Sequence, residues 1–202
     1  MVTDRYSVSG VHPENQYYPN SEILVNRLNI QNEDLLDEFE YLALDRTIQC
    51  FYEDVEARIS FDSKLLKDIH QVFLGEMYVW AGQYRTVAIK KGHSTFAMPQ
   101  YIPKLMEKFD RQIKQEDYLK QFSLEKLAYF KCELIAIHPF REGNGRTIRL
   151  FCDLLCLKNG QGRIRYPDGD ENFKDAYIKA SEAAVINADY HPMLELLRLG
   201  FG

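Results

Sequence analysis

The stretch from residue 145 to 158 constrains the fold more than any other, because it is apolar on almost every face of the helix that its spacing predicts. Apolar residues recur there at steps of three and four, namely Ile148, Phe151, Cys152, Leu155 and Cys156. Leucines at positions 150, 154 and 157 fill the remaining faces. A helix of this kind is stable only where other elements cover it on all sides. The chain must therefore fold as layers around one central helix.

Six further segments show the spacing of helices with one apolar face. They cover about residues 33–56, 62–79, 100–116, 123–137, 170–187 and 192–199. Another helix is expected to start near Asn20 or Ser21, and Asp62 and Ser123 are candidate N-caps of two others. The prediction is an all-α fold of about seven to eight helices.

The segment from Gly82 to Pro99 departs from this helical pattern. β-Branched and aromatic residues precede and follow the triplet Lys91-Gly92-His93, whose composition favours a turn. We therefore expect a small β-hairpin between helices. It is the only good strand signal that the sequence offers.

The length of 202 residues predicts one domain. Residues 1–20 are polar and rich in turn-forming residues, so we expect a loose lead-in followed by a single domain over 21–202. No run approaches the roughly 18 apolar residues of a membrane span, and the first residues contain no apolar leader. On these grounds we expect a cytoplasmic protein that makes no use of a membrane.

Charge and cysteine content exclude further classes of protein. Lys and Arg total 25 and Asp and Glu total 30, which gives a net charge of −5. This balance argues against broad nucleic-acid binding, which requires a basic surface, but it allows a small local anion site. The four cysteines contain no CxxC pair, so we expect no structural zinc site and interpret them as core residues in a reducing compartment.

The loop over residues 138–149 carries the residues suited to chemistry. Pro139 ends the preceding helix, which leaves His138 at a helix terminus facing the loop. The Gly-Asn-Gly triplet at 143–145 tolerates positive φ, so successive backbone N–H groups can converge into a nest that binds an anion. This nest opens into the N terminus of the central helix, where the helix dipole adds positive potential.

The nest needs help from charged side chains. A helix terminus contributes up to ~2 kcal/mol to anion binding, whereas micromolar affinity requires about 8 kcal/mol. Arg146 and Arg149 lie three residues apart, project from one side of the helix, and can both bind phosphate oxygens. Glu142 is the single carboxylate beside the nest, and Mg²⁺ is typically held by one or two carboxylates plus substrate phosphates. These residues suit a nucleotide polyphosphate with Mg²⁺ better than a lone phosphate.

His138 would then act as a base that takes the proton of an attacking hydroxyl. The same residues also have a purely structural interpretation. A histidine at a helix end, a Gly-Asn-Gly turn and two solvated arginines are each common in proteins without a phosphate site. From the residues alone, both interpretations stay open.

The residues His138–Arg149 match without a mismatch the pattern HxFx[DE]GNGRxxR of the Fic family (filamentation induced by cAMP). The stretch Tyr18-Pro19-Asn20 resembles the N-terminal signature of bacterial Fic proteins, and residues 80–85 resemble the start of the family's flap hairpin. The resemblance covers roughly residues 17–197. It implies a Fic-like helical domain with a flap over 82–99 and an active-site loop over 138–149.

The reaction that this resemblance implies is transfer of AMP from ATP, with Mg²⁺, to a Ser, Thr or Tyr hydroxyl of a target protein, releasing pyrophosphate. By position, His138 would be the general base, Glu142 would hold Mg²⁺, and Arg149 would hold the γ-phosphate. The phosphates would be bound by Gly143, Asn144, Gly145 and Arg146.

Three further expectations concern the surroundings of this nucleotide site. The flap would register the target protein by main-chain pairing. Lys90 is expected on the flap near the nucleotide. Tyr177 is expected on the adenine side, with a place in the core as the alternative.

Two features refine the resemblance. The related Doc toxins carry Lys at the position of Gly145 and transfer the γ-phosphate, so Gly145 favours AMP transfer. Many Fic proteins contain an inhibitory helix with the pattern [ST]xxxE[GN], and this sequence has no match to it. The chain therefore resembles the class that a separate small antitoxin inhibits, and we expect such a partner to supply a Glu to Arg149.

Two alternatives to AMP transfer stay open. One is a related nucleotidyltransferase or Doc-like phosphotransferase, and the other is a catalytically silent nucleotide-binding or interaction domain. The sequence names neither the target protein nor the oligomeric state.

Overall fold

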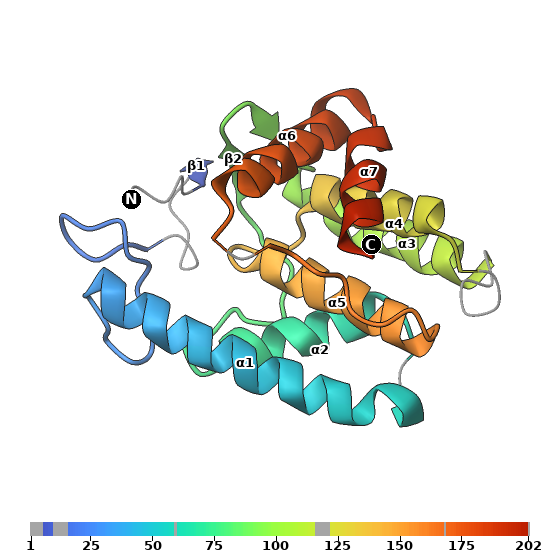
Figure 1. Cartoon of the computed structure of the whole chain (residues 1–202). Helices are drawn as coiled ribbons and strands as arrows, with labels where there is room; N and C mark the ends of the chain where they lie inside the picture. Colours follow the sequence, from blue (N-terminus) through green and yellow to red (C-terminus); the bar gives the residue numbers. More distant parts are fainter. Residues whose placement is uncertain (1–5, 10–15, 59, 116–121, 168, 202) are drawn as a thin grey trace.

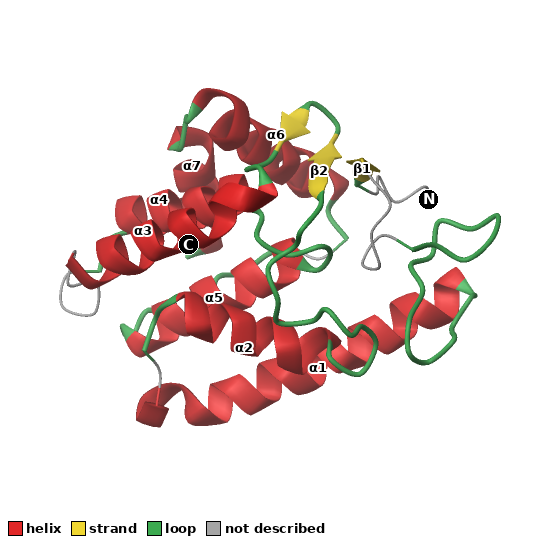
Figure 2. Cartoon of the chain, turned by 180° about the vertical axis from the view of Figure 1, so that it is seen from behind, coloured by secondary structure: helices red, strands yellow, loops and turns green. Residues whose placement is uncertain are grey.

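The apolar segment predicted to be central forms helix α5 (Asn144–Lys158), and it lies in the middle of the molecule (Figure 1). Helices α1 (Glu33–Arg58) and α2 (Ser63–Leu74) cover one side of it, and α4 (Leu124–Ile137) packs on the other. The view from behind shows the same order of layers (Figure 2). Along α5 the side chains of Ile148, Phe151 and Cys152 are all at most 1% exposed. The prediction of a central buried helix is therefore confirmed.

The structure is a computed structural model that describes residues 6–9, 16–58, 60–115, 122–167 and 169–201. Within these ranges the chain forms seven α-helices, one 3-10 helix and three short strands. The elements not yet introduced are β1 (Ser7–Ser9), β2 (Ala88–Lys91), β3 (Ser94–Thr95), the 3-10 helix η2 (Pro99–Tyr101), α3 (Ile102–Gln115), α6 (Glu171–Asn187) and α7 (His191–Gly200). The predicted all-α fold is confirmed.

Both predicted N-caps are present. The Asp62 carboxylate accepts the backbone N–H groups of Lys64 and Leu65, and the Ser123 hydroxyl accepts that of Lys126. Helix α2 ends earlier than residue 79, because the chain after Leu74 turns to bury aromatic side chains in a second apolar cluster beneath α1. These caps fix where α2 and α4 begin, and α4 leads directly into the loop of interest.

The prediction of a helix starting near Asn20 or Ser21 is wrong. Asn20 adopts a left-handed conformation with φ of 55°, and the residues before α1 form turns. The side-chain amide of Asn26 donates to the carbonyl of Ile30 (2.8 Å) and accepts its N–H (2.9 Å). Because an asparagine side chain satisfies the backbone in this way, a loop competes successfully with a helix here.

The predicted hairpin is present but shorter than expected, with β2 and β3 joined at Gly92, which has φ of 54°. A third strand, β1, pairs antiparallel with the other edge of β2, so the strand order is β1-β2-β3. Residues 7–9 are therefore ordered against the flap, which corrects the expectation of a loose lead-in for this part of residues 1–20. Residues 1–5 and 10–15 lie outside the described residues.

In the described ranges, no helix is both long and apolar enough to pass through a lipid bilayer. Cys132, Cys152 and Cys156 are buried core residues, as predicted, whereas Cys50 is exposed on α1. The described part of the chain holds no cluster of three or more His, Cys, Asp or Glu side chains suited to a metal ion.

Candidate functional site

His138 terminates α4 in a left-handed conformation, with φ of 50° and ψ of 63°. Its Nδ1 lies 3.1 Å from the carbonyl oxygen of Ile135. A carbonyl only accepts hydrogen bonds, so Nδ1 carries the proton and Nε2 of the neutral ring has a free lone pair. That Nε2 accepts a hydrogen bond of 2.6 Å from the hydroxyl of Tyr6. The ring is therefore oriented as a base toward a bound hydroxyl.

The surroundings keep this imidazole neutral. Its ring stacks on that of Phe96 on the flap, with 3.8 Å between ring centres and 16° between planes. Burial lowers the pKa of His138 to about 3, and the positive charges of Arg85 and Lys91 act in the same direction. The ring is consequently unprotonated at neutral pH and able to accept a proton.

The guanidinium of Arg85 joins the flap to the end of α4. It is buried and donates hydrogen bonds to the carbonyl oxygens of His138 (2.7 Å), Val87 (2.7 Å) and Ala97 (2.6 Å). The last carbonyls of a helix lack partners within the helix, so a cation that binds them there is stabilising. Arg85 thereby holds both ends of the flap against the histidine.

The loop after His138 is closed by its own asparagine. The side chain of Asn144 accepts the N–H of Phe140 (2.8 Å) and donates to the carbonyl of the same residue (2.7 Å). The Asn144 side chain therefore shapes the loop, and its predicted part in phosphate binding would fall to its backbone N–H. The N–H groups at the start of α5 are left to face the site.

His70 on α2 packs against the loop between α4 and α5. Its ring stacks on Phe140, with ring centres 3.9 Å apart and 13° between planes. Its Nε2 lies 2.9 Å from the carbonyl of Glu142 and therefore donates, while its Nδ1 accepts the N–H of Gly82 at 2.8 Å. One buried ring thus fixes the position of the loop and of the start of the flap.

The two glycines of the loop differ in backbone conformation and in the space around them. Gly143 is the N-cap of α5 with φ of 75°, and a Cβ there would lie 2.7 Å from the side chain of Leu74. Gly145 is in the helix without positive φ, and a Cβ there would meet nothing within 4 Å. Of the triplet that was expected to tolerate positive φ, only Gly143 adopts it. The space beside Gly145 is open to a ligand.

Arg146 and Glu142 lie side by side at the start of α5. The Arg146 guanidinium forms an ion pair with Glu40 of α1, stacks over the ring of Phe73, and lies 3.9 Å from a carboxylate oxygen of Glu142. That oxygen also accepts the N–H of Gly143 at 2.9 Å. Burial raises the pKa of Glu40 above its usual value, and the positive charge of Arg146 offsets only part of this rise. Glu40 holds Arg146 in place at the anion site.

A cavity of about 420 Å³ collects most of the predicted residues. Its wall includes Glu142, Gly143, Gly145, Arg146 and Arg149. Tyr6, Lys91 and Arg141 line it too. Its volume lies within the range of small-molecule sites, and its cationic wall suits a polyphosphate.

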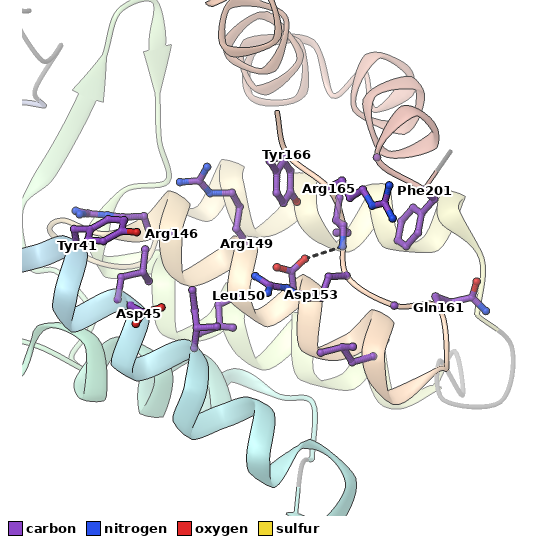
Figure 3. Close-up of a pocket in the computed structure, with 17 residues that line it drawn as sticks. Tyr41, Asp45, Arg146, Arg149, Leu150, Asp153, Gln161, Arg165, Tyr166 and Phe201 are labelled. Carbon is purple, nitrogen blue, oxygen red and sulfur yellow. Dashed lines mark hydrogen bonds between the residues drawn. The ribbon is translucent and has the colours of Figure 1, made fainter. Parts of the chain in front are cut away.

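Arg149 connects this cavity to a second, larger one of about 1170 Å³ between α1, α5 and residues 161–166 (Figure 3). Figure 3 shows Arg149 rising from α5, and its guanidinium carbon lies 5.8 Å from the centre of the Tyr166 ring. In the described part of the chain no carboxylate forms an ion pair with Arg149. Its charge is therefore available to an incoming anion or acidic group.

Two predicted residues lie elsewhere. Lys90 points to the outer face of β2, because side chains alternate along a strand and its neighbour Ile89 is buried. Lys91 is on the same side of β2 as Ile89 and lines the smaller cavity, which Lys90 does not. Its Nζ lies 5.7 Å from the centre of the Tyr6 ring. Tyr177 packs beside Tyr166, with 6.3 Å between the ring centres. It lines neither of the two cavities that contain Arg149.

Several residues that contact the candidate site were not predicted from the sequence. Arg85, Lys91 and Arg141 stand within or next to the motifs that were identified, so proximity to those motifs was a usable signal. Glu40 and Tyr6 had no local signal, because they reach the site from positions 106 and 132 residues away from their partners.

Comparison with known proteins identifies relatives of this architecture. The model of the Fic/DOC family matches residues 60–156. The chain is 32% identical over 168 residues to a probable protein adenylyltransferase, y4lH, of Sinorhizobium fredii, covering 81% of this chain and 85% of that protein. It is 32% identical over 150 residues to the probable protein adenylyltransferase Fic of Escherichia coli, covering 71% and 72%.

A solved structure confirms the fold. The BepC protein of Bartonella tribocorum with bound AMPPNP superposes with a TM-score of 0.76, covering 93% of this chain and 96% of that one, at 22% identity.

The two loop glycines predict different mutant effects. We expect Gly143→Ala to lower the free energy of unfolding by about 2–4 kcal/mol, because it combines an unfavourable backbone conformation with a clash against Leu74. Gly145→Ala should leave stability unchanged or slightly higher, since alanine favours a helix, but should weaken ATP binding about tenfold by filling the open space. Urea unfolding and titration calorimetry measure the two effects. Equal destabilisation by both substitutions would contradict the assignment.

The buried His70 predicts a pH dependence of stability. Burial lowers its pKa from 6.5 to about 4, so between these values the unfolded chain binds a proton that the folded chain does not. The stability due to the neutral ring is therefore complete above pH 6.5 and is lost as the pH falls toward 4. From pH 7 to 5 the wild type should lose about 1–2 kcal/mol more than His70→Gln.

Urea unfolding at the two pH values measures this difference. His93→Gln is the control, because His93 is exposed on the flap turn. The same loss of stability in the wild type and in His70→Gln would show that the ring is not buried neutral.

Proposed function

Since this chain belongs to the Fic/DOC family, we propose that it is a protein adenylyltransferase that transfers AMP from ATP to a hydroxyl side chain of a target protein. The observation that carries the proposal is the geometry of His138. Its unprotonated Nε2 holds a phenolic hydroxyl at 2.6 Å beside a cationic cavity. A base, a hydroxyl and a polyphosphate site in contact are what transfer to a hydroxyl requires.

The reaction follows from these positions. The acceptor oxygen attacks the α-phosphorus of ATP, and its proton passes to Nε2 of His138. The bond between the α-phosphorus and the oxygen that bridges to the β-phosphate breaks, so pyrophosphate leaves with that electron pair. The N–H groups at the start of α5, with Arg146 and Arg149, stabilise the negative charge that develops on the phosphate oxygens.

Glu142 fits the role of a magnesium ligand. It is a hard oxygen donor on the wall of the phosphate cavity, and its side chain is 27% exposed, so it can reach an ion that is held mainly by the nucleotide. A bound Mg²⁺ would neutralise charge on the phosphates. Because Oε1 of Glu142 already accepts the N–H of Gly143, the loop fixes the direction of this carboxylate.

The flap fits the role of a docking strand for the target. Strand β2 has only four residues and pairs on both of its edges, with β3 on one and with β1 on the other. A target segment would register itself by the same main-chain hydrogen bonds. Phe96 and Arg85 keep the flap against His138, so a segment on β2 delivers its hydroxyl to the base.

Regulation by a separate antitoxin fits the larger cavity. It exposes Arg149 and Arg146 next to a groove between α1 and α5, where a partner's glutamate would compete with the γ-phosphate for Arg149. The chain purified without this partner should be active, whereas a silent chain would favour an inhibitor within the chain itself.

We place the reaction in the cytoplasm, where ATP and Mg²⁺ are abundant.

Labelled ATP separates the proposed reaction from Doc-like phosphate transfer. Incubation with a bacterial lysate and Mg²⁺ should transfer label to protein from α-labelled ATP and not from γ-labelled ATP. His138→Ala should lower the rate about 10²–10⁴-fold, because the general base is lost. Label from γ-labelled ATP alone would establish phosphate transfer instead. Nucleotide binding without any transfer would establish a binding domain.

A further inference from the structure

Strand β1 occupies the position on the flap that a target segment would take. Ser7 pairs with Lys90, Val8 with Ile89 and Ser9 with Ala88, in an antiparallel register. Val8 also packs against the small apolar cluster of Val87, Ile89 and Phe96. The segment is thus held both by its main chain and by an apolar side chain, as a bound peptide strand would be.

The residue just before β1 places its hydroxyl at the catalytic base. The hydroxyl of Tyr6 lies 2.6 Å from Nε2 of His138, and its ring is edge-on to Phe96 at 6.1 Å and to His138 at 5.2 Å. Lys91 lies over the ring from the flap side. Tyr6 also lines the cavity that contains Gly143, Gly145 and Arg146, so its oxygen faces the phosphate site.

We propose that Tyr6 is an acceptor for this enzyme's own reaction, so that the chain transfers AMP from ATP to its own Tyr6 hydroxyl. The proposal rests on the function proposed above, and it adds a substrate that lies within the molecule. Its basis is the coincidence of two independent placements, the pairing of β1 with the flap and the contact between the phenol and the base.

The chemistry of the step is balanced. The Tyr6 oxygen forms a bond to the α-phosphorus of ATP, the bond from that phosphorus to the bridging oxygen breaks, and pyrophosphate leaves. The phenolic proton passes to His138. Burial raises the pKa of Tyr6 above its usual value, so the phenol stays protonated until a base in contact removes its proton. The product is a phosphodiester between AMP and Tyr6.

The intramolecular position has a kinetic consequence. A reacting pair held in contact within one molecule behaves as a unimolecular system with a high effective concentration. The fraction of Tyr6 modified per unit time should therefore not change when the protein is diluted tenfold at constant ATP. Until it reacts, Tyr6 fills the place of a target hydroxyl, so target modification should lag behind self-modification.

The test is to incubate the full chain with ATP and Mg²⁺ and to follow the intact mass and the fragment masses by mass spectrometry. The expected result is the addition of one AMP group per chain, located on Tyr6, with a rate independent of protein concentration. Tyr6→Phe should lose this addition, and so should His138→Ala. Tyr101→Phe is the matched control, because Tyr101 is exposed on η2 and its substitution should leave the addition unchanged.

A second variant tests the docking of β1 and keeps the acceptor hydroxyl. Val8→Asp places a charge in the apolar cluster, so β1 should leave the flap and the modification of Tyr6 should fall at least tenfold. Hydrogen exchange gives a readout that does not depend on activity. The amides of β2 should exchange faster in Val8→Asp than in the wild type or in Tyr101→Phe.

The outcomes distinguish this inference from the proposed function. If α-labelled ATP labels lysate proteins or another residue of the chain while Tyr6 stays unmodified, the inference is overturned and the proposed function stands. A rate of Tyr6 labelling that rises with protein concentration also overturns it, because the reaction is then between molecules. If nothing is labelled from α-labelled ATP, both proposals fail together.

Discussion

The buried guanidinium of Arg85 is the contact on which the geometry of the site depends. It donates to the carbonyl oxygens of Ile137 and His138 at the end of α4 and to those of Val87 and Ala97 on either side of the flap hairpin. A flap of six strand residues has little stability of its own. Because one cation satisfies both the helix end and the hairpin, the flap and His138 form a single unit.

The loop between α4 and α5 is rigid for a similar reason. Asn144 closes it from within, His70 supports it from α2, and Gly143 gives it the turn that no other residue makes without strain. The result is a positive cavity in a protein whose net charge is −5. The overall charge describes the surface average, whereas ligand binding depends on a few oriented N–H groups and arginines at one helix terminus.

The sequence predicts well those features that depend on local spacing. The buried helix α5, the caps at Asp62 and Ser123 and the turn at Gly92 each follow from a few neighbouring residues, and all are present. It fails where side-chain contacts, and not the spacing of apolar residues, decide the outcome. The choice between Lys90 and Lys91 depends on which face of β2 packs against the core, and the loop around Asn26 replaces a helix through its side-chain hydrogen bonds.

The same limit applies to the site. The pattern over residues 138–149 predicted a base, phosphate-binding glycines and two arginines, because these residues share one loop and the first turns of one helix. It did not reveal that Glu40 holds Arg146 or that Tyr6 contacts His138, because no periodicity links residues more than one hundred positions apart. Such contacts are decided by how the layers stack around α5.

His138 occupies a backbone conformation that favours glycine. A non-glycine residue with φ of 50° costs about 1–2 kcal/mol, and α4 could end in the same way with glycine at no such cost. The chain therefore gives up stability at the residue that we propose as the general base. The left-handed conformation directs the imidazole away from the side-chain positions of a regular helix and against Phe96 of the flap. Folding and catalysis favour different residues at this position.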